Sequence, residues 1–140
     1  MKYSVAYFSR TGNSQRIARK IAQKLSIEAV EVTDKMKWKG LFGYLRAVRC
    51  SRNNKDYEIL IHGKIDSDEY IVVTPLWAGH ITPAIRELLK TIPKNKVHLI
   101  VSSGSSTLRE RADYKSVVDI ISKKKNEDEK IDALIASLSP

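Results

Sequence analysis

The fold prediction begins at the stretch Tyr7-Phe8-Ser9-Arg10-Thr11-Gly12-Asn13-Ser14. Residues 3–8, which include its first two residues, are mostly apolar and rich in aromatic and β-branched types, as is typical of a buried strand. After it, apolar residues recur at helical spacing with basic and polar residues between them: Ile17, Ala18, Ile21, Ala22 and Leu25. This spacing predicts an amphipathic helix, for which Asn13 or Ser14 is available as the N-cap. The quoted stretch is therefore a polar turn between a first strand and a first helix.

The same alternation continues along the chain. Further strands are predicted at 28–33, at 69–74 with Pro75 as the break, at 97–101 and at 117–121. Helices are predicted from Pro83 to Ile92 and from Ile131 to Leu138, with a less regular helical spacing in 35–56 and a short extended piece at 57–61. A crossover helix is expected between 104 and 114, but the residues there support only one or two turns. Short buried strands that alternate with helices predict an α/β fold whose mostly parallel sheet is covered on both faces.

Length and composition narrow the class of protein. The chain has 140 residues, which predicts a single domain over 1–140. It has one cysteine, Cys50, which excludes an internal disulfide and a multi-cysteine metal site. No stretch approaches the roughly 20 apolar residues of a transmembrane helix. The N-terminus is too short and too polar for a secretory signal. A cytoplasmic protein without a bound metal is expected.

The charge of the chain is strongly basic. Its formal net charge is +9, which favours acidic partners. Between residues 35 and 55 there are seven basic residues and no acid, and Trp38, Phe42 and Tyr44 lie among them. That mixture is compatible with a nucleic-acid or anionic-surface binding module. Charge runs more often form a solvated face, so nucleic acid is not the favoured partner.

Three loops follow the carboxyl ends of predicted strands: 9–14, 75–82 and 102–108. In open parallel sheets, ligands bind at this edge, where the strand order reverses. The first loop carries hydroxyls, an amide and Gly12 directly before a helix N-terminus, where backbone N–H groups and the helix dipole attract a phosphate. The chain lacks Gly-x-Gly-x-x-Gly and Gly-Lys-Ser/Thr, so a dinucleotide fingerprint and a triphosphate-binding P-loop are excluded. A monophosphate ligand is favoured.

The first loop resembles the phosphate loop of the flavodoxin family, Ser/Thr-x-Thr-Gly-x-Ser/Thr after the first strand. Val73-Thr74-Pro75-Leu76-Trp77-Ala78-Gly79 resembles the segment that lines the flavin ring in that family. Residues 40–47 resemble a segment common in short bacterial and archaeal flavodoxin-like proteins. The resemblance implies a three-layer α/β/α flavodoxin-like fold with a five-stranded parallel sheet in the order 2-1-3-4-5, which is the order of flavodoxin itself.

The resemblance also implies FMN as a non-covalent cofactor and assigns residues to it. The phosphate would be bound by the side chains of Ser9, Thr11, Asn13 and Ser14 and by the backbone N–H groups of Arg10 and Gly12. The isoalloxazine would be lined by Pro75, Leu76, Trp77, Ala78 and Gly79, and on the other wall by Ser102, Ser103, Gly104 and Ser105. Trp77 would stack on the ring or shield its edge, or else anchor the loop to the core. His80 would face the flavin and supply a proton, or lie in solvent as an ordinary loop histidine.

The implied function is an FMN-binding electron-transfer protein that shuttles electrons between redox partner proteins, whose acidity the basic charge would favour. The alternative is an FMN-dependent NAD(P)H:quinone-type reductase. Loop 102–107 lacks the tyrosine that many flavodoxins place against the ring, so that face is open or is covered by Tyr44 or another residue. No catalytic side chain is predicted, because the chemistry belongs mainly to the cofactor. Flavodoxins are typically acidic, so a basic chain predicts a less strongly reducing flavin.

Overall fold

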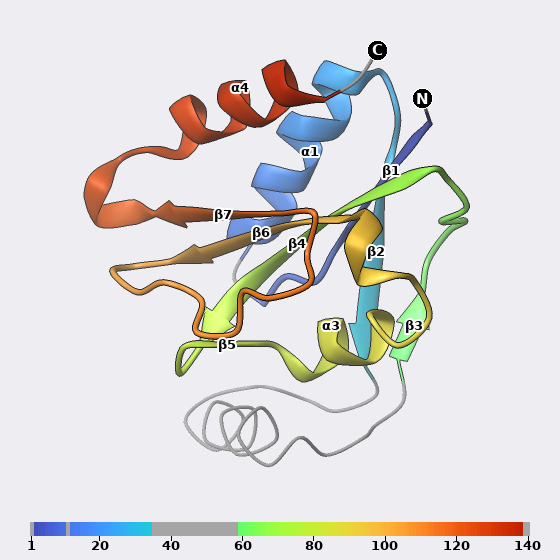
Figure 1. Cartoon of the computed structure of the whole chain (residues 1–140), viewed down its shortest axis with the longest axis horizontal. Coiled ribbons are helices and arrows are strands. Elements are labelled where there is room, and N and C mark those ends of the chain that lie inside the picture. Colours follow the sequence, from blue (N-terminus) through green and yellow to red (C-terminus); the bar gives the residue numbers. More distant parts are fainter. Residues whose placement is uncertain (1, 11, 35–58, 139–140) are drawn as a thin grey trace.

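The computed structural model describes residues 2–10, 12–34 and 59–138 (Figure 1). The strands are β1 (Tyr3–Tyr7), β2 (Ala29–Asp34), β3 (Ile59–Ile61), β4 (Glu69–Trp77), β5 (His80–Ile81), β6 (Val97–Ser103) and β7 (Ser116–Ile121). The α-helices are α1 (Asn13–Leu25), α3 (Pro83–Leu88) and α4 (Glu127–Ser137), with short 3-10 turns η1 (Lys94–Lys96) and η2 (Ser122–Lys124). Thr11, Cys50, the predicted helix in 35–56 and the flavodoxin-like segment 40–47 lie outside the described residues.

The parallel part of the sheet has the predicted strand order. Five strands run parallel in the spatial order β2-β1-β4-β6-β7, which is the order 2-1-3-4-5 when parallel strands are numbered along the chain. The register places Tyr7 beside Val73, and Val73 beside Ile100. Two short antiparallel strands join the sheet: β3, which lies within the extended piece predicted at 57–61, pairs with β2, and β5, which was not predicted, pairs with β4. The described sheet therefore has seven strands rather than five.

The prediction that Pro75 ends its strand is wrong. β4 continues through Pro75 to Trp77, and Pro75 lies beside Ser102 of β6. On its other side, β1 has already ended opposite Val73. Proline is tolerated at strand positions with one free side, because its missing N–H is then not needed on that side. The extension carries β4 beyond its parallel neighbour and lets it form the hairpin with β5.

Alternation along the strands divides the core into two clusters. Val5 and Tyr7 of β1 pack on one face with the apolar side of α1 and with Ile131 and Leu134 of α4. Ala6 and Phe8 face the opposite side, where the cluster includes Ala84, Ile85 and Leu88 of α3. Successive side chains of a strand point to opposite faces, so each face of a central strand can bury its own apolar set.

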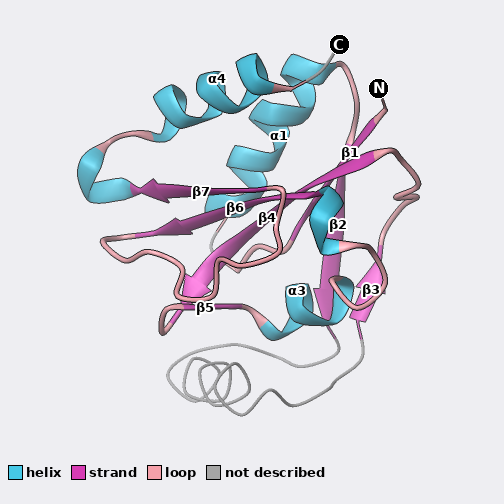
Figure 2. Ribbon diagram, in the orientation of Figure 1, coloured by secondary structure: helices cyan, strands magenta, loops and turns pink. Residues whose placement is uncertain are grey.

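The helices complete a three-layer α/β/α arrangement. Figure 2 shows α1 and α4 together on one side of the sheet and α3 on the other. α3 ends at Leu88, earlier than the predicted Ile92, and the connection from 104 to 115 contains no helix. Leu108 and Tyr114 of that connection pack on the α3 side instead. Among the described residues, no helix is long and apolar enough to cross a membrane.

Candidate functional site

The first loop places a left-handed glycine at the start of α1. Gly12, with φ of 95°, is the N-cap, and Asn13 is already the first helical residue, so the predicted N-cap at Asn13 or Ser14 is wrong. The Gly12 N–H donates a hydrogen bond of 2.9 Å to Ser9 Oγ. The N–H of Arg16 donates to the Gly12 carbonyl oxygen at 3.0 Å and closes the first turn. Glycine adopts this backbone conformation without the steric cost that a Cβ imposes.

This helix start leaves a buried hydroxyl without a partner. Ser14 is 1% exposed, and its Oγ has no hydrogen-bond partner among the described residues. Among the residues that the structure describes, no side chain caps α1, its first turn carries no acidic residue, and a Cβ built on Gly12 would meet nothing within 4 Å. The first N–H groups of a helix have no partner inside the helix, and they lie at the positive end of its dipole. The start of α1, here called the phosphate cradle, therefore offers the Ser14 hydroxyl and backbone N–H groups as donors, and open space over Gly12, all of which suit an anion.

The second loop is a β-hairpin closed by a two-residue turn. Ala78 and Gly79 have φ of 54° and 81°, and two positive φ values are the pattern of the type I′ turn that joins tightly paired strands. Trp77 at its base is 6% exposed and packs edge-on against Phe8, with ring centroids 5.7 Å apart. Trp77 therefore anchors the hairpin to the core, and its contact with a flavin stays a prediction.

The third loop is tied to this hairpin. The Arg109 N–H donates to the Gly79 carbonyl oxygen at 3.1 Å. A Cβ on Gly79 would lie 2.7 Å from Arg109 Nε, so the glycine lets the two segments approach closely. His80 Nδ1 lies 3.9 Å from a carboxylate oxygen of the exposed Glu110. The second and third loops thus lie side by side at the carboxyl edge of the sheet, as the topology predicts.

A cavity of about 450 Å³ opens between these loops and the start of α4. The predicted residues that line it come from all three loops: Asn13, Pro75, Ser102, Ser103 and Gly104. The sequence interpretation missed the rest of its lining: Arg16, Ile17, Ile120, Ile121, Ser122, Lys125, Asn126 and Glu127. The other described members of the predicted site do not line the cavity; they are Ser9, Arg10, Gly12, Ser14, Leu76, Trp77, Ala78, Gly79, His80 and Ser105. Their assignment to a cofactor stays a prediction.

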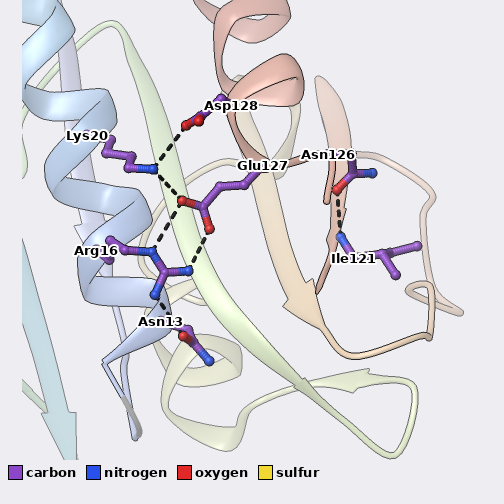
Figure 3. Close-up of polar contacts among 7 residues, drawn as sticks. All are labelled: Asn13, Arg16, Lys20, Ile121, Asn126, Glu127 and Asp128. Carbon is purple, nitrogen blue, oxygen red and sulfur yellow. Dashed lines mark hydrogen bonds and ion pairs between the residues drawn. The ribbon is translucent and has the colours of Figure 1, made fainter. Parts of the chain in front are cut away.

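The missed side of the cavity is held by a polar network (Figure 3). Arg16 donates to Asn13 Oδ1 at 2.8 Å, and its Nε and Nη2 donate to the two carboxylate oxygens of Glu127 at 3.2 and 2.6 Å. Lys20 Nζ reaches Glu127 at 2.6 Å and Asp128 at 3.0 Å. The hydrogen bond from Arg16, together with Lys20, lowers the pKa of Glu127 to about 2. The carboxylate is therefore ionised near neutral pH.

Asn126 connects the same network to the sheet. Its Oδ1 accepts a hydrogen bond of 2.9 Å from the N–H of Ile121, at the end of β7 (Figure 3). Arg16 lies three residues after Asn13, and this spacing places both on one helix face, which is the signal that could have found it. The region 123–128 lies between the strand predicted at 117–121 and the helix predicted from Ile131, and no site residue was predicted there, so Asn126 and Glu127 were missed. Among the described residues, no group of side chains with metal-binding potential occurs.

Comparison with known proteins identifies the fold. No protein-family model matches the chain, and no curated protein matches its sequence. A flavoprotein from Lactobacillus acidophilus, solved in complex with FMN, is 21% identical with a TM-score of 0.66, over 92% of this chain and 97% of that one. The apo-form of the flavoprotein from that organism, solved by NMR, has a TM-score of 0.56 over 90% of this chain and 96% of that one.

A protein from Bacteroides eggerthii, whose crystal structure was described as that of a flavoprotein, is 19% identical in sequence. Its structure matches with a TM-score of 0.73 over 96% of each chain. At this level of identity the likeness concerns the fold. Together with the strand order β2-β1-β4-β6-β7 and the layers of helices, it shows that the chain has a flavodoxin-like fold, shared with these solved proteins over nearly their whole length.

Proposed function

We propose that this chain is an FMN-binding flavoprotein that carries electrons between redox partner proteins. The observation that carries the proposal is the unpartnered Ser14 hydroxyl in the first turn of α1, a helix start whose Asn13 and Ile17 line the cavity at the carboxyl edge of the sheet. A buried hydroxyl without a partner costs free energy, and a ligand oxygen would remove that cost. The flavoprotein from Lactobacillus acidophilus, which has the same fold, was solved with FMN and supports this choice of ligand.

The residues present fit a flavin monophosphate. Ser14, the open space over Gly12 and the first-turn N–H groups would hold the phosphate. Ser102, Ser103 and Pro75 would lie along the cavity, and the 76–81 hairpin would border it. Bound FMN would supply the redox chemistry. The chain would bind and orient the cofactor and limit its contact with water.

The phosphate cradle is tested by comparing two flavins. The protein freed of cofactor is titrated with FMN and with riboflavin, which lacks the phosphate, and binding is followed by flavin fluorescence. We expect FMN to bind at least about a hundredfold more tightly, because a dianion gains from the helix dipole and several donors together. The FMN complex should also be yellow, with flavin absorption near ~450 nm. Equal affinities for the two flavins would remove the basis of the proposal.

A second assay separates an electron carrier from a reductase. The FMN-loaded protein is mixed with NADH or NADPH and a quinone. As a carrier, it is expected to oxidise neither nicotinamide at a rate above the reaction of free FMN. Rapid turnover would assign the alternative, the NAD(P)H:quinone-type reductase.

A cytoplasmic location is part of the proposal. The nucleic-acid alternative depended on 35–55, which lies outside the described residues.

A further inference from the structure

Three consecutive lysines follow the last parallel strand at the mouth of the cavity. Figure 1 shows the connection from β7 to α4. It contains Lys123, Lys124 and Lys125, here called the lysine loop, and all three are exposed. The N–H of Lys123 donates to the Gly104 carbonyl oxygen at 3.1 Å, which fixes the lysine loop against loop 102–108. Lys125 itself lines the cavity.

Within the part of the chain that the structure describes, the lysine loop differs from the neighbouring cations in having no acidic partner. On α1, Arg16, Lys20 and Lys24 are paired with acids of α4 at 2.6 to 3.2 Å. Over the described ranges, no ion pair joins a residue of the lysine loop to an acid. The nearest carboxylate along the chain, Glu127, is already bound by Arg16 and Lys20. No acid among residues 2–10, 12–34 and 59–138 therefore compensates the positive charge of the loop at the cavity mouth.

A second cation lies on the opposite side of the third loop. Arg109 is exposed, and its side chain packs against Gly79 in the hairpin that borders the site. The acid beside it in sequence, Glu110, is the one that lies near His80. Cations thus occur on both sides of the third loop at the carboxyl edge of the sheet. A field of one sign around a redox site steers an oppositely charged partner toward it.

We propose that the lysine loop is the docking surface for an acidic face of the redox partner protein. This inference rests on the proposed function, because it assumes that a flavin occupies the adjacent cavity. Lysines are mobile point charges that suit a brief encounter, whereas arginines favour fixed bidentate contacts. Loop 122–125 carries no aromatic side chain, although stacking on aromatics is the usual means of holding single-stranded nucleic acid. An acidic protein is therefore favoured over a nucleic acid.

The test compares two variants with the same change in net charge. Lys123→Glu/Lys124→Glu alters the lysine loop but spares the cavity-lining Lys125. Lys64→Glu/Lys96→Glu alters two exposed lysines at the opposite edge of the sheet: Lys64 lies near the starts of β1 and β2, and Lys96 directly precedes β6. Each FMN-loaded protein is reduced photochemically and mixed with an acidic b-type cytochrome or with basic cytochrome c, at low and at high salt. FMN occupancy is measured first from the flavin absorption.

At low salt we expect Lys123→Glu/Lys124→Glu to slow reduction of the acidic cytochrome about tenfold or more and to speed reduction of cytochrome c. The control should change both rates by less than about threefold, and high salt should remove the differences because it screens exposed charges. Equal effects of both variants would show that only net charge matters and would overturn the proposal, as would no effect of either.

Two further results separate the docking proposal from its foundation. If the unaltered protein takes up no FMN, the proposed function fails and the docking proposal falls with it. If FMN binds and the rates do not respond to the lysine loop, only the docking proposal fails. A fluorescent single-stranded oligonucleotide is titrated in parallel. If it binds more tightly than the acidic cytochrome and is released by Lys123→Glu/Lys124→Glu, the surface belongs to nucleic acid and not to a redox protein.

Discussion

Burying a hydroxyl without a partner costs roughly 1–3 kcal/mol, and Ser14 is in that situation in the described structure. Ser14→Ala is therefore expected to leave the stability of the cofactor-free protein unchanged or to raise it by about 1 kcal/mol. The same change should weaken FMN binding about tenfold, because the phosphate loses a donor. Urea unfolding and a fluorescence titration measure the two effects.

Ser137→Ala provides the control for Ser14. The Ser137 hydroxyl donates to the Leu134 carbonyl oxygen at 2.6 Å within α4, and Ser137 does not line the cavity. This variant should leave FMN affinity unchanged. The prediction for Ser14 is wrong if Ser14→Ala clearly destabilises the cofactor-free protein and leaves FMN affinity intact, since the hydroxyl would then serve the fold and not the ligand.

Residue patterns in the sequence predicted some of the residues that line the cavity but not its α4 side. Asn13, Pro75 and Ser102–Gly104 could be predicted to line the cavity because the carboxyl ends of parallel strands meet at one edge. The helical spacing from Asn13 could also have pointed to Arg16, but its contact with Glu127 could not be predicted, because it joins residues 111 positions apart. The sequence could not show that the Ser14 hydroxyl lacks a partner. Its role depends on which residue is the N-cap of α1, and this residue is Gly12 and not Ser14.

At the scale of elements, α1 and α4 are joined by ion pairs, and their strength should depend on pH. The pKa of Glu127 is lowered from 4.5 to about 2, chiefly by the hydrogen bond from Arg16. A carboxyl with a lowered folded-state pKa contributes stability above its unfolded value, and this contribution is lost as the pH falls toward the folded value. Because Arg16 and Lys20 are partly exposed, solvent screens the pairs, and the contribution should be about 1 kcal/mol.

Glu127→Gln tests this. At neutral pH it should lower the free energy of unfolding by about 1 kcal/mol. Between about pH 4.5 and about pH 2, the difference from the unaltered protein should shrink toward zero, as urea unfolding at a series of pH values would show. Asp132→Asn removes the more exposed pair with Lys24 and should cost less, within about 0.5 kcal/mol. A difference that persists at the acid end would contradict an electrostatic origin.

The elements themselves were predicted where a period repeats over many residues. The five parallel strands and the amphipathic α1 follow from runs of apolar residues at fixed spacing. β5 is too short to show a period, and the piece predicted at 57–61 gave no sign of its antiparallel pairing; β3 and β5 exist as strands because a neighbouring strand offers an edge. The extension of β4 past Pro75 depends likewise on where β1 ends, which is a property of the assembled sheet and not of the local sequence.

At the scale of the whole molecule, the excess positive charge is unevenly compensated. The pairs between α1 and α4 neutralise that face, whereas the lysine loop leaves the cavity mouth positive. A positive potential favours the reduced, more negative flavin, so the midpoint potential of bound FMN should be higher than in acidic flavodoxins. If the charge that matters is local, the cation that lines the cavity should contribute more than an equal charge elsewhere.

Lys125→Gln and Lys96→Gln remove the same charge at the cavity and at the opposite edge of the sheet. Lys125→Gln should lower the midpoint potential by some tens of millivolts, because Coulomb interactions between partly exposed charges a few ångströms apart are worth about 1 kcal/mol. Lys96→Gln should shift it by only a few millivolts, since exposed charges beyond about 10 Å are screened at ordinary salt. Spectroscopic titration against reference dyes measures both. Equal shifts in the two variants would show that the chain's total charge, and not the lysine beside the cavity, sets the potential.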